Sequence, residues 1–282
     1  MHPHRYGRPR PSRRGFSLPE ILIVVGIIAV LAGLLLTVRS RATHKASQVL
    51  CLNNLRQIGM AFTQYAQNND QAFPFGAPAD APGDRKEDWI HFRATVDELP
   101  KKINGSAIAP YVGAKGAGFI KLMQCPSDEI ETHQVDGRTG FPYRFSYSMN
   151  YLFDSDRGKT WNRGATPRVT AVNKPAEKIL VAEENERTIN DGFWAPGNYP
   201  SPDNRKSGWV VNYDYLSIRH DTHKAEFIDP RDFQGRLLAQ LKQGNVLFVD
   251  GHADFVTRRY AHSAEHLLIN DEGTGTPQIE NN

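Results

Sequence analysis

Eighteen consecutive residues without a charged side chain, Ile21–Val38, constrain this chain more than any other feature. A helix rises about 1.5 Å per residue, so this segment is about long enough to cross the hydrocarbon core of a bilayer. Residues 1–15 contain five arginines and no acidic residue. Because positively charged flanks stay in the cytoplasm, the sequence predicts a single-pass protein with a cytoplasmic N-terminus and most of the chain on the other side of the membrane.

An acidic residue, Glu20, stands at the edge of this apolar segment. A charge inside the membrane costs on the order of 3 kcal/mol, so such a residue usually has a partner. Cleavage between Gly15 and Phe16 would create an α-amine four residues earlier, and the amine of a neighbouring subunit could neutralise the carboxylate. A local explanation is equally open, because Ser17 and Glu20 have the S-x-x-E spacing of a capping box and Pro19 is tolerated in a first helical turn.

Two common membrane signals leave this carboxylate unexplained. A secretory signal peptide has a shorter apolar core, and small residues of the A-x-A kind follow it. Here R-S-R-A-T-H follows the apolar segment, and the small residue, Gly15, precedes it. A plain signal anchor gives no reason for either Gly15 or Glu20.

The stretch G-F-S-L-P-E that begins at Gly15, followed by an apolar helix, resembles the class III signal of type IV pilins and type II secretion pseudopilins. The resemblance implies that a prepilin peptidase cleaves after Gly15 and methylates the amine of Phe16. It also implies that Glu20 pairs with the N-terminus of a neighbour during assembly. Ser17 replaces the usual threonine of the pattern, and Pro19 is less usual at its position. The implied partners are the peptidase, other pilin or pseudopilin subunits, an inner-membrane assembly platform and the lipid bilayer.

The helix is predicted to continue beyond the apolar segment. After Pro19 no proline occurs before Pro74, and one face of the intervening sequence carries apolar residues at helical spacing: Cys51, Leu55, Ile58, Phe62 and Tyr65. We expect this stripe to pack on a globular head. The predicted parts are a leader at residues 1–15, a helix at 16–66 of which 16–38 forms the membrane span or filament core, and a periplasmic or extracellular head at 67–282.

The head has the pattern of short strands separated by loops. The predicted strands are 145–153, 178–184, 209–218 and 245–249, and a short helix is predicted at 231–243. Strands beside one long helix predict an α+β fold with an antiparallel sheet packed on that helix. Asp250-Gly251 lies between two apolar runs and predicts a β-hairpin with a two-residue turn.

Several segments of the head are similar to large pilin-like proteins with an H-X9-DG C-terminal region, which are abundant in Planctomycetes and related bacteria. The segments are C-L-N-N-L-R-Q-I-G-M-A-F, C-P-S-D, S-Y-S-M-N-Y, I-L-V-A-E-E and N-V-L-F-V-D-G-H. The likeness implies the family but no biochemical activity. Gln240 occupies the place of the defining histidine, ten residues before Asp250. Arg219-His220 is similar to the expected pair, displaced by an insertion, so a contact between His220 and Asp250 stays an open question.

The only two cysteines, Cys51 and Cys125, are a candidate disulfide. A bridge can persist outside the inner membrane. Closing a loop of about 75 residues would stabilise the head by roughly 4 kcal/mol in the chain-entropy model. The alternative is a pair of buried thiols.

Histidines and carboxylates in the head supply candidate metal ligands, of the types that bind zinc or, with oxygen alone, calcium. The residues considered are Glu183, His220, His223, Asp250, His252 and Asp254. No H-E-x-x-H, C-x-x-C or twelve-residue calcium loop is present, so the default expectation is structural histidines and no cofactor. If a metal binds, the predicted set is His220, Asp250, His252 and Asp254, with Ca²⁺ ahead of zinc because some pseudopilins carry calcium in the head.

Enzymatic and nucleic-acid functions find little support in the sequence. It contains no G-x-S-x-G elbow, P-loop or Rossmann fingerprint, which predicts that the protein is not an enzyme. The net charge is only +3 and the arginines of residues 1–15 supply it, which argues against a nucleic-acid surface.

The sequence therefore predicts a structural subunit of a type IV pilus-like or type II secretion pseudopilus filament. Two alternatives stay open. One is a membrane-tethered or filament-tip protein that binds polysaccharide or a secreted substrate, because Trp194 and Trp209 can either stack on a sugar or anchor loops. The other is a tethered metallohydrolase around His220 and Asp250.

Overall fold

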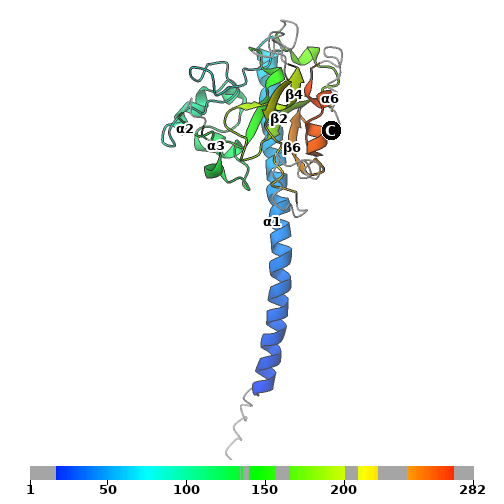
Figure 1. Ribbon diagram of the computed structural model, residues 1–282. Coiled ribbons are helices and arrows are strands. Elements are labelled where there is room, and N and C mark those ends of the chain that lie inside the picture. Colours follow the sequence, from blue (N-terminus) through cyan, green and yellow to red (C-terminus); the bar gives the residue numbers. More distant parts are fainter. Residues whose placement is uncertain are drawn as a thin grey trace, which may run out of the picture. The chain divides into compact units, whose positions relative to one another are not determined.

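The computed structural model divides into two compact units, Met1–Thr43 and His44–Asn282. Helix α1, Leu18–Asn68, contributes to both units (Figure 1). The structure describes residues 17–133, 135, 140–156, 166–200, 209–221 and 240–269, and within these it leaves out the side chains of 34–42, 196–200, 209–213 and 264. The predicted leader, the predicted cleavage site and most of the predicted helix at 231–243 lie outside the described residues.

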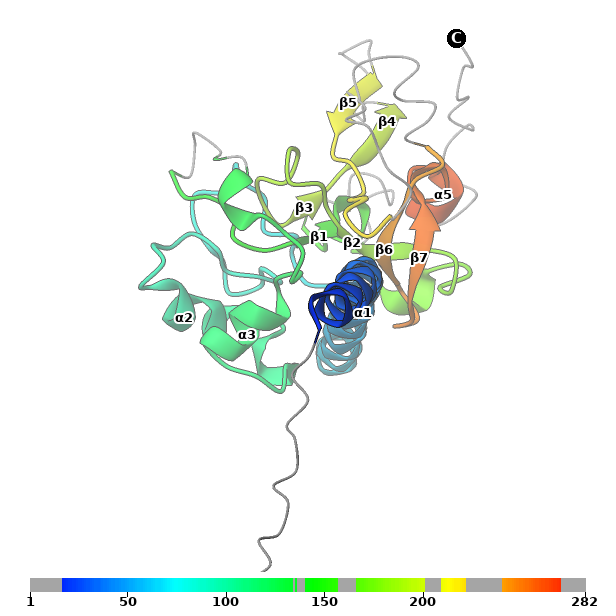
Figure 2. The same cartoon turned by 90° about the horizontal axis from the view of Figure 1, so that it is seen from below.

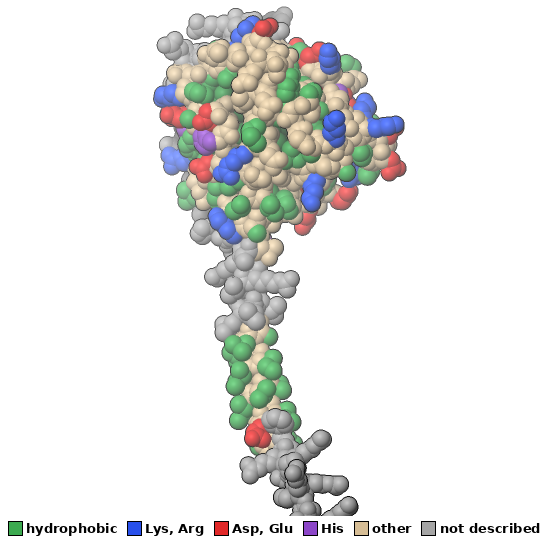
Figure 3. Space-filling model, turned by 180° about the vertical axis from the view of Figure 1, so that it is seen from behind, with side chains coloured by type: hydrophobic (Ala, Val, Ile, Leu, Met, Phe, Trp, Pro, Cys, Tyr) green, Lys and Arg blue, Asp and Glu red, His purple; other side chains and the backbone are tan. Residues whose placement is uncertain are grey.

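The first unit consists of the N-terminal part of α1, which is apolar on every side. Ten large hydrophobic side chains between Leu18 and Leu31 are 53–76 % exposed. Figure 3 shows hydrophobic side chains gathered along this part of α1. Among the residues that could be searched, those the structure describes, no helix combines the length and the hydropathy that a membrane span needs. A helix that is apolar all round is normally covered by lipid or by other protein.

The second unit is built on a five-stranded sheet with strand order β3-β1-β2-β6-β7. Pairing is antiparallel for β1–β2, β2–β6 and β6–β7 and parallel for β1–β3. The bounds are β1 Tyr147–Asn150, β2 Ile179–Glu183, β3 Phe193–Trp194, β6 Gln243–Phe248 and β7 Ala253–Thr257. A separate two-stranded sheet pairs β4, Pro196–Pro200, with β5, Trp209–Tyr213.

Short helices and turns complete the described part of this unit. The α-helices are α2 Leu99–Lys102, α3 Ala117–Leu122, α5 Arg258–Ala261 and α6 Ala264–Leu267. The 3₁₀ turns are η1 Ile103–Gly105, η2 Ala109–Tyr111, η3 Ile130–Thr132, η4 Tyr151–Phe153 and η6 Val169–Ala171. Figure 2 looks along α1 and shows the row of strands beside it.

Alternation along β6 explains how the sheet is covered on both faces. Leu247 belongs to the core cluster that contains the α1 stripe, whereas Val246 and Phe248 belong to a second cluster with Ala261 of α5 and Leu267 of α6. Successive strand side chains point to opposite faces, so α1 covers one face and the short helices cover the other. The predicted α+β fold, a long helix packed on a largely antiparallel sheet, is confirmed.

The predicted strands differ from the observed ones in two respects. Segments 145–153, 178–184 and 245–249 contain β1, β2 and β6, but 209–218 contributes β5 to the small separate sheet. The predicted hairpin is present, with a three-residue rather than a two-residue connection. Gly251 has φ 93° and its N–H donates to the Phe248 oxygen at 3.0 Å. A turn closed by a glycine of positive φ is the usual form of a three-residue hairpin loop.

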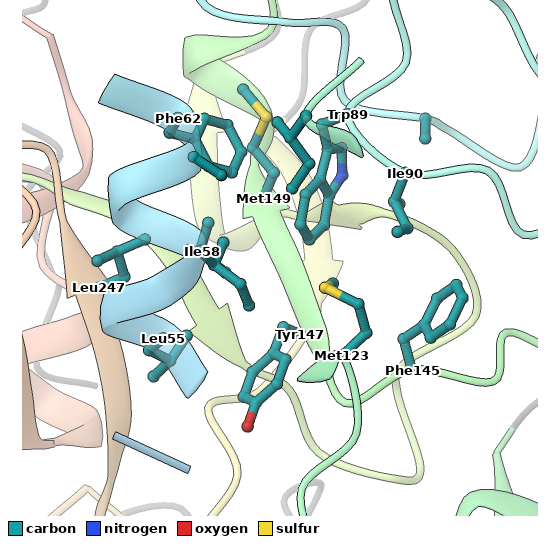
Figure 4. Close-up of a cluster of buried hydrophobic side chains, with 14 of the residues drawn as sticks. Leu55, Ile58, Phe62, Trp89, Ile90, Met123, Phe145, Tyr147, Met149 and Leu247 are labelled. Atoms are coloured by element: carbon teal, nitrogen blue, oxygen red, sulfur yellow. The ribbon is translucent and has the colours of Figure 1, made fainter. Parts of the chain in front are cut away.

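The predicted stripe on α1 forms the centre of the core. Cys51, Leu55 and Ile58 are fully buried, Phe62 is 3 % exposed, and Tyr65 is half-buried. Figure 4 shows Leu55, Ile58 and Phe62 on α1 beside buried side chains of β1 and β6, among them Tyr147, Met149 and Leu247. The helical spacing of the stripe therefore predicted correctly which face of α1 is buried.

A glycine on the same face allows α1 to approach the β6–β7 hairpin closely. A Cβ atom at Gly59 would lie 2.7 Å from Leu247 Cδ1 and 3.1 Å from the Gly251 oxygen. In a free helix, replacing glycine by alanine stabilises the helix by about 1 kcal/mol. Overpacking a protein core lowers the stability of the fold by about 1–3 kcal/mol. The second contact is to backbone, which cannot rotate away, so we expect the packing cost to exceed the gain.

Gly59→Ala should therefore lower the free energy of unfolding by about 1–2 kcal/mol, measured by urea denaturation of the full chain in detergent. The neighbouring Met60 is 56 % exposed, and Met60→Ala is a control expected to change stability by less than about 0.5 kcal/mol. An increase in stability for Gly59→Ala would contradict the close approach of α1 to the hairpin.

Candidate functional sites

The start of α1 carries the residue that the sequence singled out. Glu20 Oε2 accepts hydrogen bonds from the Ser17 backbone N–H and from Ser17 Oγ, each at 2.7 Å. Ser17 precedes the first helical residue, so this carboxylate satisfies a backbone donor at the helix start, as one half of a capping box does. Glu20 is also exposed. It is thus held beside Ser17, the second residue of the chain that cleavage after Gly15 would leave. Gly15 and Phe16 lie outside the described residues.

A second site is a buried cluster of four ligand-type side chains: Cys51, Cys125, Glu183 and His220. Their potential ligand atoms lie within 4.8 Å of one another, and the residues are 0, 3, 0 and 4 % exposed. Four separate segments contribute to it: the buried stripe of α1, the loop after α3, the last residue of β2, and the turn that follows Leu216. We call this group the buried cluster.

Short contacts join the members of the buried cluster. Cys125 Sγ lies 3.1 Å from His220 Nε2, and the same nitrogen lies 3.4 Å from Glu183 Oε1. The other carboxylate oxygen, Oε2, accepts a 2.7 Å hydrogen bond from Asn245 Nδ2. Cys51 and Cys125 are both free thiols here, so the structure departs from the predicted disulfide. The sulfur atoms share the cluster with an imidazole and a carboxylate instead of forming a bond of about 2.05 Å.

Arg219, next to His220 in the chain, supplies a buried positive charge. Its Nη1 lies 2.7 Å from Asp128 Oδ2 and 3.2 Å from Glu183 Oε1. Its Nη2 donates to the Glu184 backbone oxygen at 2.9 Å. Both carboxylate side chains are fully buried, and the Arg219 side chain is 9 % exposed. One guanidinium therefore compensates two buried carboxylates.

The electrostatics of the buried cluster follow from these contacts. Burial raises the pKa of Glu183, but the His220 imidazole and the Arg219 guanidinium outweigh it and hold the pKa below its ordinary value. The same holds for Asp128: burial raises its pKa, but His133 and Arg219 lower it by more, so the pKa lies below its ordinary value. Burial lowers the pKa of His220, yet the neighbouring Cys125 and Glu183 raise it to about 9. Without a cation, burial keeps Cys125 a neutral thiol, because it raises the pKa of that group far above its ordinary value.

The buried cluster is not arranged for nucleophilic catalysis. In a nucleophile–histidine–carboxylate triad the carboxylate binds the ring nitrogen opposite the one that faces the nucleophile. Here Glu183 and Cys125 both lie next to Nε2 of His220. Nδ1 of His220 is buried and has no hydrogen-bond partner among the described residues. A buried thiol with a raised pKa is also a poor nucleophile. This geometry gives no support to a hydrolase around His220.

The structure does not bring the four predicted metal ligands together. Asp250, His252 and Asp254 lie on the exposed end of the β6–β7 hairpin, where His252 Nδ1 is 2.6 Å from Asp250 Oδ1. Asp254 Oδ1 accepts the N–H of Phe255 at 2.7 Å. His220 is instead buried in the cluster with the cysteines. Asp250, His252 and Asp254 are exposed in the turn and on the strand after it, whereas His220 is buried, so the open question of a His220–Asp250 contact is answered in the negative. His223 lies outside the described residues.

The tryptophans considered for sugar binding give no exposed platform in the described residues. Trp194 is fully buried, and its ring meets that of His262 at 5.8 Å in a T-shaped arrangement. It therefore packs inside the head from strand β3 and presents no face to a sugar. The side chain of Trp209 lies outside the described residues.

Comparisons with known proteins bear on the N-terminal site alone. A family model described as the prokaryotic N-terminal methylation motif matches residues 10–36. This match supports a pilin-like or pseudopilin-like precursor. It spans Gly15, Phe16, Glu20 and the start of α1, and the head lies outside it. No curated protein and no solved structure matches the chain.

Proposed function

We propose that this chain is a structural subunit of a type IV pilus-like or type II secretion pseudopilus filament. A prepilin peptidase cleaves it between Gly15 and Phe16 and methylates the new amine of Phe16. The observation that carries the proposal is the methylation motif over residues 10–36, with Glu20 at the start of the apolar helix. In this role the chain is a substrate of an enzyme and is not itself an enzyme. The likeness to H-X9-DG pilin-like proteins supports the same function.

The apolar surface of α1 is consistent with a subunit whose helix moves from the lipid bilayer into a filament. Side chains from Leu18 to Leu31 expose hydrophobic groups on all sides of the helix. Contiguous apolar surface on a protein normally marks a contact with lipid or with other protein. In the proposed cycle, the uncharged segment Ile21–Val38 first lies in the inner membrane, with the head in the periplasm. After assembly, the same surface packs against equivalent helices of neighbouring subunits.

Glu20 gives the proposed assembly its register. Transferring an unpaired charge into an apolar environment costs on the order of 3 kcal/mol. When the methylated amine of one subunit forms an ion pair with the Glu20 carboxylate of its neighbour, the two charges neutralise each other and this cost is avoided. Until then, the hydrogen bonds from Ser17 keep the carboxylate at the helix start. A neighbour placed in another register would leave both charges unpaired.

The intact mass of the protein isolated from inner membranes tests the proposal. We expect the mass of the chain without residues 1–15, increased by one methyl group, and tandem fragmentation should place the methyl on the amine of Phe16. A Gly15→Leu variant is the control, and it should keep its leader because the small residue before the cleavage site is lost. A wild-type chain that retains residues 1–15, or a Gly15→Leu variant cut at the same bond, would refute the proposal.

A further inference from the structure

The potential ligand atoms of the buried cluster lie nearly as close together as the ligand atoms of a metal-coordination tetrahedron. With zinc–sulfur bonds of about 2.3 Å and zinc–nitrogen or zinc–oxygen bonds of about 2.0–2.2 Å, ligand atoms around tetrahedral zinc lie about 3.3–3.8 Å apart. The measured separations are 3.1 Å from Cys125 Sγ to His220 Nε2 and 3.4 Å from that nitrogen to Glu183 Oε1. No pair among the four ligand atoms exceeds 4.8 Å. We propose that the head binds one structural zinc ion through Cys51, Cys125, Glu183 and His220.

The types of ligand select zinc over calcium. Two of the four are cysteines, and thiolates are soft ligands that favour zinc, whereas calcium takes oxygen ligands only. A tetrahedral site with four protein ligands has no open position for a substrate, which is the pattern of a structural rather than a catalytic zinc. The ligands are between 0 and 4 % exposed, so solvent has little access to the metal.

One carboxylate oxygen of the buried cluster has charged neighbours but no hydrogen bond. Glu183 Oε1 is fully buried and lies 3.2 Å from Arg219 Nη1 and 3.4 Å from His220 Nε2, and neither contact has the geometry of a hydrogen bond. Buried polar atoms normally have a hydrogen-bond partner or bind an ion. A cation bound by Oε1, Nε2 and the two sulfur atoms would satisfy this oxygen.

The surroundings of the buried cluster balance the charge of the metal site. Zinc with two thiolates, one carboxylate and a neutral imidazole has a net charge of about −1 by the ordinary charges of these ligands. Arg219 Nη1, 3.2 Å from Glu183 Oε1, supplies the compensating positive charge. Asn245 Nδ2 holds the other carboxylate oxygen at 2.7 Å, and Ser146 Oγ accepts the backbone N–H of Cys125 at 2.7 Å. Such outer contacts orient metal ligands and raise affinity.

Zinc binding would replace protons in the buried cluster. The two thiols and the imidazole each give up one proton to solvent when the ion binds, so affinity falls as the pH is lowered. The ion would connect α1, the loop after α3, the end of β2 and the turn at His220. All four segments belong to the unit His44–Asn282, so the metal would tie the helix to the sheet within the head. This inference does not depend on the filament role.

Metal analysis of the full-length chain, purified in detergent, tests the site. Elemental analysis by inductively coupled plasma mass spectrometry should find about one zinc per chain, because the four ligands bind a single ion. After exchange, cobalt(II) should give a sulfur-to-metal charge-transfer band and the intense visible bands of a tetrahedral ion. Removal of zinc by a chelator should lower the melting temperature of the chain, and added zinc should restore it.

Two sets of variants separate the buried cluster from the hairpin. Cys125→Ser should lose at least about nine tenths of the bound zinc, because a neutral hydroxyl replaces a thiolate ligand. His252→Ala and Asp254→Asn change exposed candidate ligands on the hairpin and should keep zinc at the wild-type level. The cobalt spectrum of the wild type needs no variant, so a folding defect in Cys125→Ser cannot decide the result.

Three results would overturn the zinc proposal. The first is a wild-type chain that holds less than about one tenth of a zinc per molecule after reconstitution and shows no tetrahedral cobalt spectrum. The second is a native mass two hydrogens lighter than that of the thiol form, which would identify a Cys51–Cys125 disulfide. The third is loss of zinc from His252→Ala while Cys125→Ser keeps it, which would place the metal on the hairpin.

Discussion

A Glu20→Ala variant is expected to be cleaved and methylated normally and to be almost absent from filaments. The substitution leaves the cleavage site intact, but the amine of the neighbouring subunit then enters an apolar environment without its partner. At a cost on the order of 3 kcal/mol, incorporation should fall about 100-fold. The measurement compares the variant in the membrane fraction and in the sheared or pelleted filament fraction, with intact mass as the check on processing.

Two further variants separate the assembly role of Glu20 from its capping role. Glu20→Gln keeps hydrogen-bond acceptors for Ser17 but removes the charge, so it should fail to assemble like Glu20→Ala. Ser17→Ala removes one hydrogen bond and keeps the charge, with an expected effect of about 1 kcal/mol on the helix start and little effect on incorporation. Normal incorporation of Glu20→Ala would exclude the registering role and favour a membrane-tethered or filament-tip binding protein.

An Arg219→Met variant is expected to lose about 3–5 kcal/mol of the free energy of unfolding. Arg219 Nη1 lies 2.7 Å from Asp128 and 3.2 Å from Glu183, and both carboxylates are fully buried. Removing the guanidinium leaves Asp128 with His133 alone and Glu183 with His220 alone, and breaking a buried ion pair is far more costly than losing a surface contact. Chemical denaturation of the full chain in detergent at neutral pH measures the loss.

The pH dependence identifies the origin of this loss. The pKa values of Asp128 and Glu183 are lowered in the folded state. The stability that the two carboxylates contribute is therefore present above their unfolded values of about 4, and it is lost as the pH falls through the lower folded values. The difference in the free energy of unfolding between wild type and Arg219→Met should therefore be largest near neutral pH and should become smaller below a pH of about 4.

A matched arginine provides the control. Arg144 pairs with Glu131 at 2.9 Å, but the Glu131 side chain is 82 % exposed. Solvent screens such a pair, so Arg144→Met should cost less than about 1 kcal/mol and show little dependence on pH. Equal losses for Arg144→Met and Arg219→Met would contradict the special role of the buried arginine.

Local patterns in the sequence predicted the elements of the fold well. The spacing of Cys51, Leu55, Ile58 and Phe62 identified the buried face of α1, because helical periodicity alone decides which side chains share a face. The spacing of Ser17 and Glu20 predicted their contact for the same reason. The hairpin at Gly251 was predicted, but its loop has three residues, 249–251, because the Phe248 N–H donates to the His252 oxygen across the hairpin.

The buried cluster could not be predicted in the same way. Cys51 and Cys125 suggested a disulfide, and His220 was grouped with Asp250 because both are of metal-ligand type and lie in segments that resemble the H-X9-DG pattern. Glu183 was a candidate ligand but belonged to neither grouping. It reaches the cluster because β2 ends beside the turn that holds His220: the Ser217 N–H donates to the backbone oxygen of Glu183 at 2.7 Å. No periodicity connects residues so far apart in the chain.

The amino-acid sequence by itself determined the N-terminal signal, the long helix with its buried stripe, and the α+β class. Each of these depends on residues within a few turns or strands of one another, and local geometry controls them. Tertiary structure alone decided that Cys51, Cys125, Glu183 and His220 share one buried space next to Arg219. The packing of α1 on the sheet sets which distant side chains meet, and that packing is a property of the whole head.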